Sequence, residues 1–255
     1  MPVKLNHNIF GEGVPVMILH GVFGSARNWQ SFARSLAESH RVITVDLRNH
    51  GQSEHADSMT YFDMAEDIHA LITDLCLDKV TLIGHSMGGK VAMISALQKT
   101  VLIERLIVLD IAPVKYDRNY TGLFKAMSKL PLNTIKNRNE ADQYMNEQIN
   151  DAWLSQFLLQ NLVRADQMFQ WQFNLAAIQS NIDYVSDFPA LSTQYNGPTL
   201  FLGGTESDFI NEEYHGAIRN YFPTAVIEML AQAGLMLHIE QPEVLLDKIK
   251  SFLNQ

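Results

Sequence analysis

The chain has 255 residues, of which 47% are hydrophobic and 18% are charged, with one cysteine and a formal net charge of −9. This composition suits one large α/β domain with a sizeable core and excludes a disordered or fibrous chain. The negative charge disfavours a nucleic-acid partner. Residues 1–6 lack the apolar core of a signal peptide and no apolar run is long enough to span a bilayer, so we expect a cytoplasmic protein without a membrane partner.

Short apolar runs alternate with amphipathic stretches along most of the chain. This rhythm predicts a mostly parallel sheet covered by helices. Continuous apolar runs such as residues 106–109 suit parallel strands, which are buried on both faces. Cys76 falls within a helical pattern, and we expect its thiol to be buried. The expected strands are residues 3–9, 14–20, 42–46, 80–84, 106–110, 199–203 and 226–230.

The alternation of strand and helix stops between residues 114 and 190. The clearest patterns there predict helices at residues 139–150, 153–164 and 166–179. We therefore expect a helical cap at residues 114–190, inserted into a core made of residues 1–113 and 191–255.

A Gly-x-Ser-x-Gly pattern at residues 84–88 follows the apolar run 80–83 and precedes the helix-forming stretch 90–97. A strand, this pattern and a helix predict a nucleophile elbow, the sharp turn that exposes a reactive serine. Glycines flank the serine because the turn leaves almost no room for side chains. The pattern makes Ser86 the candidate nucleophile, at the positive end of a helix.

The chain resembles the α/β-hydrolases, and among them the small bacterial esterases of the YbfF type. The resemblance covers nearly the whole chain and implies an α/β-hydrolase fold. We expect no cofactor, and we expect no metal ion because the acidic and histidine-bearing stretch at residues 50–69 shows no known metal-ligand spacing. The resemblance also implies an oxyanion hole formed by the backbone amides of Val22 and Met87, which would stabilise the negative charge of an acyl-transfer transition state. The segments that carry the resemblance are residues 20–25, 46–53, 84–88, 109–114, 156–162 and 234–238.

A serine nucleophile needs a general base that titrates near neutral pH, and histidine is the natural choice. His238 follows the last expected strand and precedes the closing helical stretch 244–253, where the chain order of this fold places the base. Many relatives carry a further histidine shortly after the glycine at position 234, whereas this chain has Leu235. We therefore expect His238 to act without a rival. His20 is expected to be structural.

In this fold an acidic residue completes a catalytic triad with the serine and the histidine, and this chain offers more than one candidate for the acid. Most members of the fold carry it at the end of a Gly-x-x-Asp turn after a late strand, but here that position is Ser207. Asp110 ends the earlier strand 106–110, where a buried carboxylate needs a partner. The resemblance favours Asp110 as the acid, with Ser207 supporting it. Asp208 remains the alternative acid, and Glu206 the third candidate.

These residues predict a serine hydrolase that cleaves carboxylic esters or acyl thioesters. Ser86 would attack the carbonyl, His238 would take and return the proton, and Asp110 would orient the imidazole. A carbon–carbon hydrolase or lyase of the same fold is the alternative, because it would use the same triad. A haloalkane dehalogenase is disfavoured because its nucleophile would be an aspartate, and an inactive binding module because every triad position is filled.

Charge is unevenly distributed along the sequence. A positive rim near the site would attract an anionic leaving group such as the phosphates of coenzyme A, so acyl-CoA is a candidate substrate. Residues 114–138 carry only Asp117 as an acidic residue, against six basic ones: Lys115, Arg118, Lys125, Lys129, Lys136 and Arg138.

Overall fold

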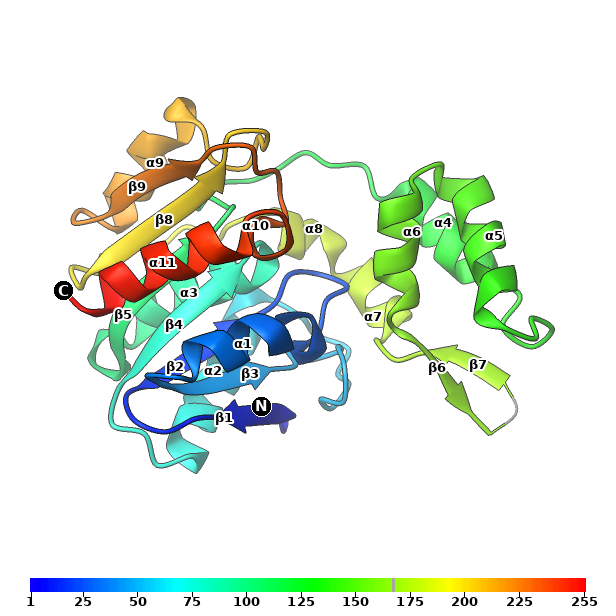
Figure 1. Cartoon of the computed structure of the whole chain (residues 1–255), viewed down its shortest axis with the longest axis horizontal. Coiled ribbons are helices and arrows are strands. Elements are labelled where there is room, and N and C mark those ends of the chain that lie inside the picture. The colour runs from blue at the N-terminus through cyan, green and yellow to red at the C-terminus, as the bar shows by residue number, and fades with distance from the viewer. Residues whose placement is uncertain (167) are drawn as a thin grey trace.

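The computed structural model describes residues 1–166 and 168–255, and within them seven strands form one sheet and two more form a separate pair (Figure 1). Only β1 runs antiparallel to its neighbour in the large sheet. In sheet order its strands are β1 (His7–Phe10), β3 (Arg41–Val45), β2 (Pro15–Leu19), β4 (Val80–His85), β5 (Ile103–Leu109), β8 (Thr199–Gly204) and β9 (Val226–Leu230).

The predicted mostly parallel sheet is therefore confirmed, and each expected strand is present within a few residues of its expected bounds. All six residues of β4 are buried, as are the last four of β5. These apolar runs remain extended because parallel strands are covered on both faces. The Ser86 amide bonds the Leu109 carbonyl at 3.0 Å, and the Asp110 amide bonds the Leu202 carbonyl at 2.8 Å. The ends of three neighbouring strands thus place residues 86 and 110 side by side.

Helices cover both faces of the sheet. Ile18 of β2 packs with the α1 and α11 side, whereas Met17 and Leu19 pack with the α2 and α3 side. This alternation follows from the period of two in a strand. In Figure 1, α1 and α11 lie in front of the sheet. The helices of the core are α1 (Gln30–Leu36), α2 (Tyr61–Asp74), α3 (Met87–Gln98), α9 (His215–Tyr221), α10 (Leu237–Glu240) and α11 (Pro242–Leu253), with short 3₁₀ turns at Ala26–Trp29, Thr100–Leu102 and Glu212–Tyr214.

A long insertion connects β5 to β8. Its first three helices and a hairpin lie to one side of the sheet, beyond α7 and α8 (Figure 1). Its elements are α4 (Thr121–Lys129), α5 (Arg138–Ile149), α6 (Ala152–Leu159), β6 (Leu162–Ala165), β7 (Met168–Trp171), α7 (Leu175–Ser180) and α8 (Ile182–Ser186).

The expected helix over residues 166–179 is wrong. Residues 168–171 form β7, which pairs antiparallel with β6 in the register Leu162↔Trp171, and a helix begins only at Leu175. Asp166 takes a φ of 54°, a left-handed conformation that aspartate tolerates in tight turns. Residue 167 lies outside the described residues. The helix expected at 153–164 is also shorter, because α6 ends at Leu159.

The expected burial of Cys76 is wrong as well. The α2 helix ends at Asp74, and Cys76 follows it with a φ of 52° and an exposed thiol. This is the left-handed position that commonly ends a helix and turns the chain toward solvent.

Lys90 of α3 joins the core to both ends of the insertion. Its buried ammonium donates to the carbonyls of Val114, Ser186 and Asp187 at 2.8, 3.0 and 2.8 Å. Burial lowers the pKa of Lys90 to about 7, and the charge of Asp187 opposes this shift. Among the described helices, none combines the length and apolarity that crossing a bilayer requires.

Candidate active site

Ser86 stands at the junction of β4 and α3 in a strained conformation. Its φ of 51° and ψ of −120° are values that non-glycine residues rarely adopt. Strain of this kind persists only where the surrounding structure enforces it, and it is concentrated at functional sites. The Ser86 carbonyl accepts from the amides of Gly89 and Lys90 at 2.8 and 3.2 Å, which starts the helix directly after the serine.

The flanking glycines allow this junction to pack against the sheet. A β-carbon on Gly84 would lie 2.2 Å from the carbonyl oxygen of Gly88, and one on Gly88 would lie 2.4 Å from that of Leu19. Both contacts are with backbone, which cannot swing away as a side chain can. Glycine is therefore required at both positions for steric reasons.

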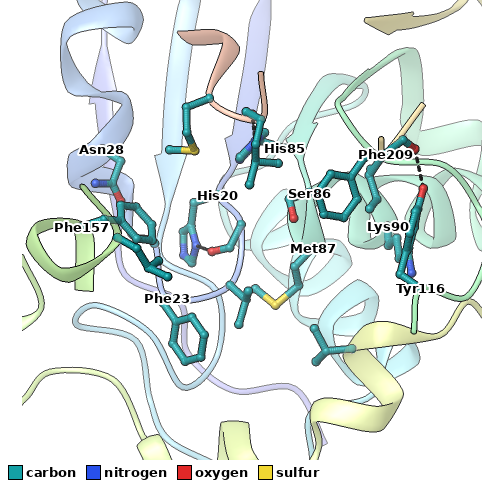
Figure 2. A pocket seen from close by; sticks show the side chains of 18 of the residues that line it. His20, Phe23, Asn28, His85, Ser86, Met87, Lys90, Tyr116, Phe157 and Phe209 are labelled. Atoms are coloured by element: carbon teal, nitrogen blue, oxygen red, sulfur yellow. Dashed lines mark hydrogen bonds between the residues drawn. The ribbon is translucent and has the colours of Figure 1, made fainter. Parts of the chain in front are cut away.

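Ser86 opens onto a cavity of ≈ 200 Å³ with mostly apolar walls. Figure 2 shows the Ser86 hydroxyl between His20 and Phe23 on one side and Tyr116 and Phe209 on the other. The walls come from both the core and the insertion, and include Phe23, Trp29, Leu123, Phe157, Phe209 and Leu235.

Val22 and Met87 also line this cavity. Within the described residues, neither backbone amide donates a hydrogen bond to another group of the chain. Unbonded amides in an apolar cavity are costly, since buried backbone donors are almost always paired. Their arrangement fits donors held ready for an oxygen atom of a bound molecule.

The loop that carries Val22 is held from two directions. Phe23 has a φ of 61°; its amide donates to Nε2 of His50 at 3.1 Å, and its carbonyl accepts from Nδ2 of Asn161 at 2.7 Å. Nδ1 of His20 lies 2.7 Å from the Gly21 carbonyl, and its Nε2 accepts from the Leu47 amide at 3.0 Å. Both ring nitrogens of His20 are thus engaged, which fits a structural role.

His238 lies on α10 and lines the same cavity as Ser86. Its ring stacks on Trp29, with centroids 4.0 Å apart, and meets the His85 ring at 5.5 Å. Neither ring nitrogen has a hydrogen-bond partner among the described residues. Burial, and secondarily the charge of His85, lower the pKa of His238 to about 3. The imidazole is therefore neutral at physiological pH, with both nitrogens free.

Asp110 follows β5 with a φ of 50° and is fully buried. Its carboxylate accepts from the Gly204 amide at 3.2 Å and from the Ser207 hydroxyl at 2.5 Å. Burial raises the pKa of Asp110 to about 6, although these two bonds oppose the shift. Asp208, the alternative acid, has a side chain 89% exposed and lies 3.8 Å from Arg118, while Glu206 is exposed.

A family model described as the α/β hydrolase fold matches residues 14–242. The chain belongs to the α/β hydrolase fold family. It is 37% identical to a protein of Danio rerio named sn-1-specific diacylglycerol lipase ABHD11, over 99% of this chain and 83% of that protein. It is 33% identical to the esterase YbfF of Escherichia coli (strain K12), over 94% and 93%. A solved structure titled marine microorganism esterase superposes with a TM-score of 0.95 at 35% identity, covering 98% of this chain and 99% of that one.

The α/β-hydrolase fold, the resemblance to YbfF-type esterases and the assignment to the hydrolases are confirmed by these likenesses. Other solved members of the fold are more distant. One, titled a meta-cleavage product hydrolase, has a TM-score of 0.75 at 17% identity, which indicates a shared fold only.

The structure brings Ser86, Val22, Met87 and His238 to one cavity of this hydrolase and places Asp110 with Ser207 beside β8. In the part of the chain that the structure describes, however, no hydrogen bond links the Ser86 hydroxyl, the His238 ring and the Asp110 carboxylate. The same described part holds no group of three or more potential metal ligands.

Sequence reasoning missed two residues of this hydrolase site. Trp29 holds the His238 ring by stacking, and His85 donates from Nε2 toward the carbonyl of Leu235 at 2.8 Å. His85 adjoins the nucleophile, a position that could have attracted attention. Nothing in the sequence marks Trp29, which is 209 residues from its partner along the chain.

Proposed function

We propose that this protein is a serine ester hydrolase that works through an acyl-enzyme on Ser86. The observation that carries the proposal is the strained Ser86 at an apolar cavity that also holds the unbonded amides of Val22 and Met87. A nucleophile beside two fixed donors is the arrangement that acyl transfer requires, because charge develops on the carbonyl oxygen as the bond to Oγ forms.

In this mechanism Ser86 Oγ attacks the carbonyl carbon, and His238 accepts the hydroxyl proton. The amides of Val22 and Met87 stabilise the oxyanion. Collapse of the tetrahedral intermediate expels the alcohol or thiol, which takes the proton from His238, and water then releases the acid by the same steps.

We propose His238 as the base because it is the histidine of this cavity whose two ring nitrogens are both free; those of His20 are bonded, and Nε2 of His85 is held by Leu235. Its ring must leave the stack on Trp29 to reach Ser86. Catalytic contacts commonly tighten only when substrate binds.

Asp110 is the acid that we propose, with Ser207 fixing its carboxylate. Because it makes no hydrogen bond to His238 in the structure, it would stabilise the imidazolium through its charge. Asp208 is not proposed, since water surrounds its side chain.

We further propose that residues 114–190 form a cap over the core of residues 1–113 and 191–255, and that this cap selects the leaving group. A second cavity, of ≈ 550 Å³, shares Tyr120 and Ser186 with the first. Arg118, Lys125 and Lys129 line it against a single acid, Asp183. A cationic cavity that adjoins an acyl site suits an acyl-CoA thioester, whose phosphates it would attract.

Such a substrate fits the cytoplasmic location that we propose. The exposed thiol of Cys76 also suits a compartment that keeps cysteines reduced.

Hydrolysis of p-nitrophenyl butyrate tests the ester hydrolase. Wild-type protein should release p-nitrophenol, and Ser86→Ala should reduce kcat by at least about 10³-fold. Retention of full activity by Ser86→Ala would refute the proposal. Cleavage of a carbon–carbon bond in a vinylogous diketone, with esters left intact, would favour the lyase or carbon–carbon hydrolase instead.

Salt dependence tests the anionic leaving group. The kcat/KM for butyryl-CoA should fall as salt is added, because salt screens the attraction between the cationic side chains and the phosphates. At physiological ionic strength the Debye length is about 8 Å, so charges further apart than this attract each other only weakly. It should fall again in Lys125→Glu/Lys129→Glu, while p-nitrophenyl butyrate responds little. Equal responses of the two substrates would contradict a role for this cavity.

A further inference from the structure

The loop between β9 and α10 runs between the nucleophile and the acid. On one side it packs on Gly204, whose amide bonds Asp110: a β-carbon on Gly204 would lie 2.2 Å from the Ala233 carbonyl oxygen and 2.5 Å from that of Gly234. On the other side, the Leu235 carbonyl accepts from His85, the residue directly before Ser86. Residue 235 is therefore fixed between the nucleophile Ser86 and the acid Asp110, which a catalytic histidine would connect.

The loop is also held rigidly at this point. The two carboxylate oxygens of Glu240 accept from the amides of Gly234 and Met236 at 2.5 and 3.1 Å, one residue on either side of Leu235. The side chain of Leu235 lines the Ser86 cavity. His238, three residues further on, is instead turned onto Trp29 and bonds neither partner.

We infer that residue 235 is the position from which an imidazole would bridge Ser86 and Asp110, and that Leu235 leaves this relay open in the wild-type protein. The inference rests on the proposed role of Ser86. A histidine there would accept the Ser86 proton on one ring nitrogen as the bond to the acyl carbon forms, and donate from the other to Asp110. Asp110 can accept it, because each carboxylate oxygen has two lone pairs and accepts one hydrogen bond from the described residues.

The buried state of Asp110 supports this reading. A buried carboxylate is normally paired with a cation or with several donors, but this one has two neutral donors and a pKa raised to about 6 by burial. An imidazolium at position 235 would supply the missing opposite charge.

The test compares Leu235→His with Leu235→Gln, a polar control that cannot act as a base, using p-nitrophenyl butyrate. A well-placed general base contributes about 10²-fold to 10⁴-fold, so Leu235→His should raise kcat by about 10²-fold or more, and Leu235→Gln should not. In Leu235→His, kcat should rise with pH between about pH 6 and 7, as the new imidazole loses its proton, and Leu235→Gln should show no such rise.

Asp110→Asn provides the second arm. It should remove most of the gain in the Leu235→His background, and the loss of kcat there should exceed the loss in the wild-type background, because only a histidine bonded to Asp110 depends on that bond for its orientation and tautomer. A structural role of Asp110 alone would give equal losses in both backgrounds and would overturn the inference.

Free imidazole gives a measurement that does not need the histidine variant to fold. Leu235→Ala opens space at the same position, so added imidazole should accelerate it more than the wild-type protein. No acceleration, or a Leu235→His variant no faster than Leu235→Gln, would overturn the inference. If Ser86 still reacts with a fluorophosphonate in those variants, the proposed function stands; if Ser86→Ala retains activity, the proposed function itself fails.

Discussion

Gly88→Ala is expected to damage catalysis more than folding. The new β-carbon would lie 2.4 Å from the Leu19 carbonyl oxygen and 2.5 Å from that of His20. In a close-packed interior these atoms must separate by about 1 Å before the contact reaches ordinary van der Waals distance. Leu19 is the last residue of β2 and His20 follows it, directly before the loop that carries Val22. The displacement therefore moves the Val22 amide relative to the Met87 amide.

Overpacking of this kind costs about 1 to 3 kcal/mol of the free energy of unfolding, which a well-packed domain survives. Misplacing one oxyanion donor costs about 10²-fold to 10³-fold in kcat. Urea unfolding gives the first quantity, and hydrolysis of p-nitrophenyl butyrate gives the second. KM should change much less than kcat, because the donors act mainly in the transition state.

Gly122→Ala is the matched control. A β-carbon on Gly122, near the start of α4, meets no atom of the described residues within 4 Å. The variant should keep wild-type kcat and gain about 0.5 kcal/mol of stability, because alanine loses less backbone entropy in a helix. A Gly88→Ala protein with wild-type kcat would refute the assignment of the Val22 loop to catalysis.

Three further outcomes are expected. The free energy of unfolding should fall as the pH drops from about 6.5 to 4, because the buried histidines have lower pKa values in the folded state than in the unfolded chain, so that only the unfolded state is protonated in this range. These histidines include His50, His85 and His238, with pKa values of about 3, 4 and 3. Each histidine contributes up to about 1.4 kcal/mol per pH unit, and together they outweigh the opposing effect of Asp110. Urea midpoints that do not change with pH would contradict this expectation. Arg48→Met should cost about 3 to 5 kcal/mol in urea unfolding, because it leaves buried Asp67 without the guanidinium that now bonds it at 2.6 and 2.8 Å; a loss below about 1 kcal/mol would exclude a role for this pair in stability. Asn161→Ala should lower kcat by about tenfold, because it removes the 2.7 Å hydrogen bond to the Phe23 carbonyl that positions the Val22 loop. An unchanged rate of hydrolysis would show that the Val22 loop keeps its position without this bond.

The sheet and the strand-to-helix turn at Ser86 could be predicted because local sequence determines them. Continuous apolar runs specify β4 and β5, and the parallel register of these strands then brings residues 86 and 110 together. The β6 and β7 hairpin could not be predicted in this way. The apolar residues around Phe169 also fit a helix, and pairing of Trp171 with Leu162 decides the outcome.

The orientation of His238 depends on contacts that are remote in sequence. Its place after the last strand follows from chain order, but its ring direction is set by stacking on Trp29. The role of Leu235 emerges only once the loop is seen between Gly204 and His85. From the sequence alone, Leu235 indicates the loss of a rival base, whereas in the structure its loop lies between Gly204, which bonds Asp110, and His85, which precedes Ser86.

Covalent labelling of Ser86 is the most direct test of the central claim. A fluorophosphonate should form one phosphonyl ester per chain with loss of fluoride, and peptide mass spectrometry should place the added mass on Ser86. Prior incubation with p-nitrophenyl butyrate should slow the labelling, and Ser86→Ala should take up no label. Labelling at another residue, or none in the folded wild-type protein, would contradict a serine nucleophile at this site.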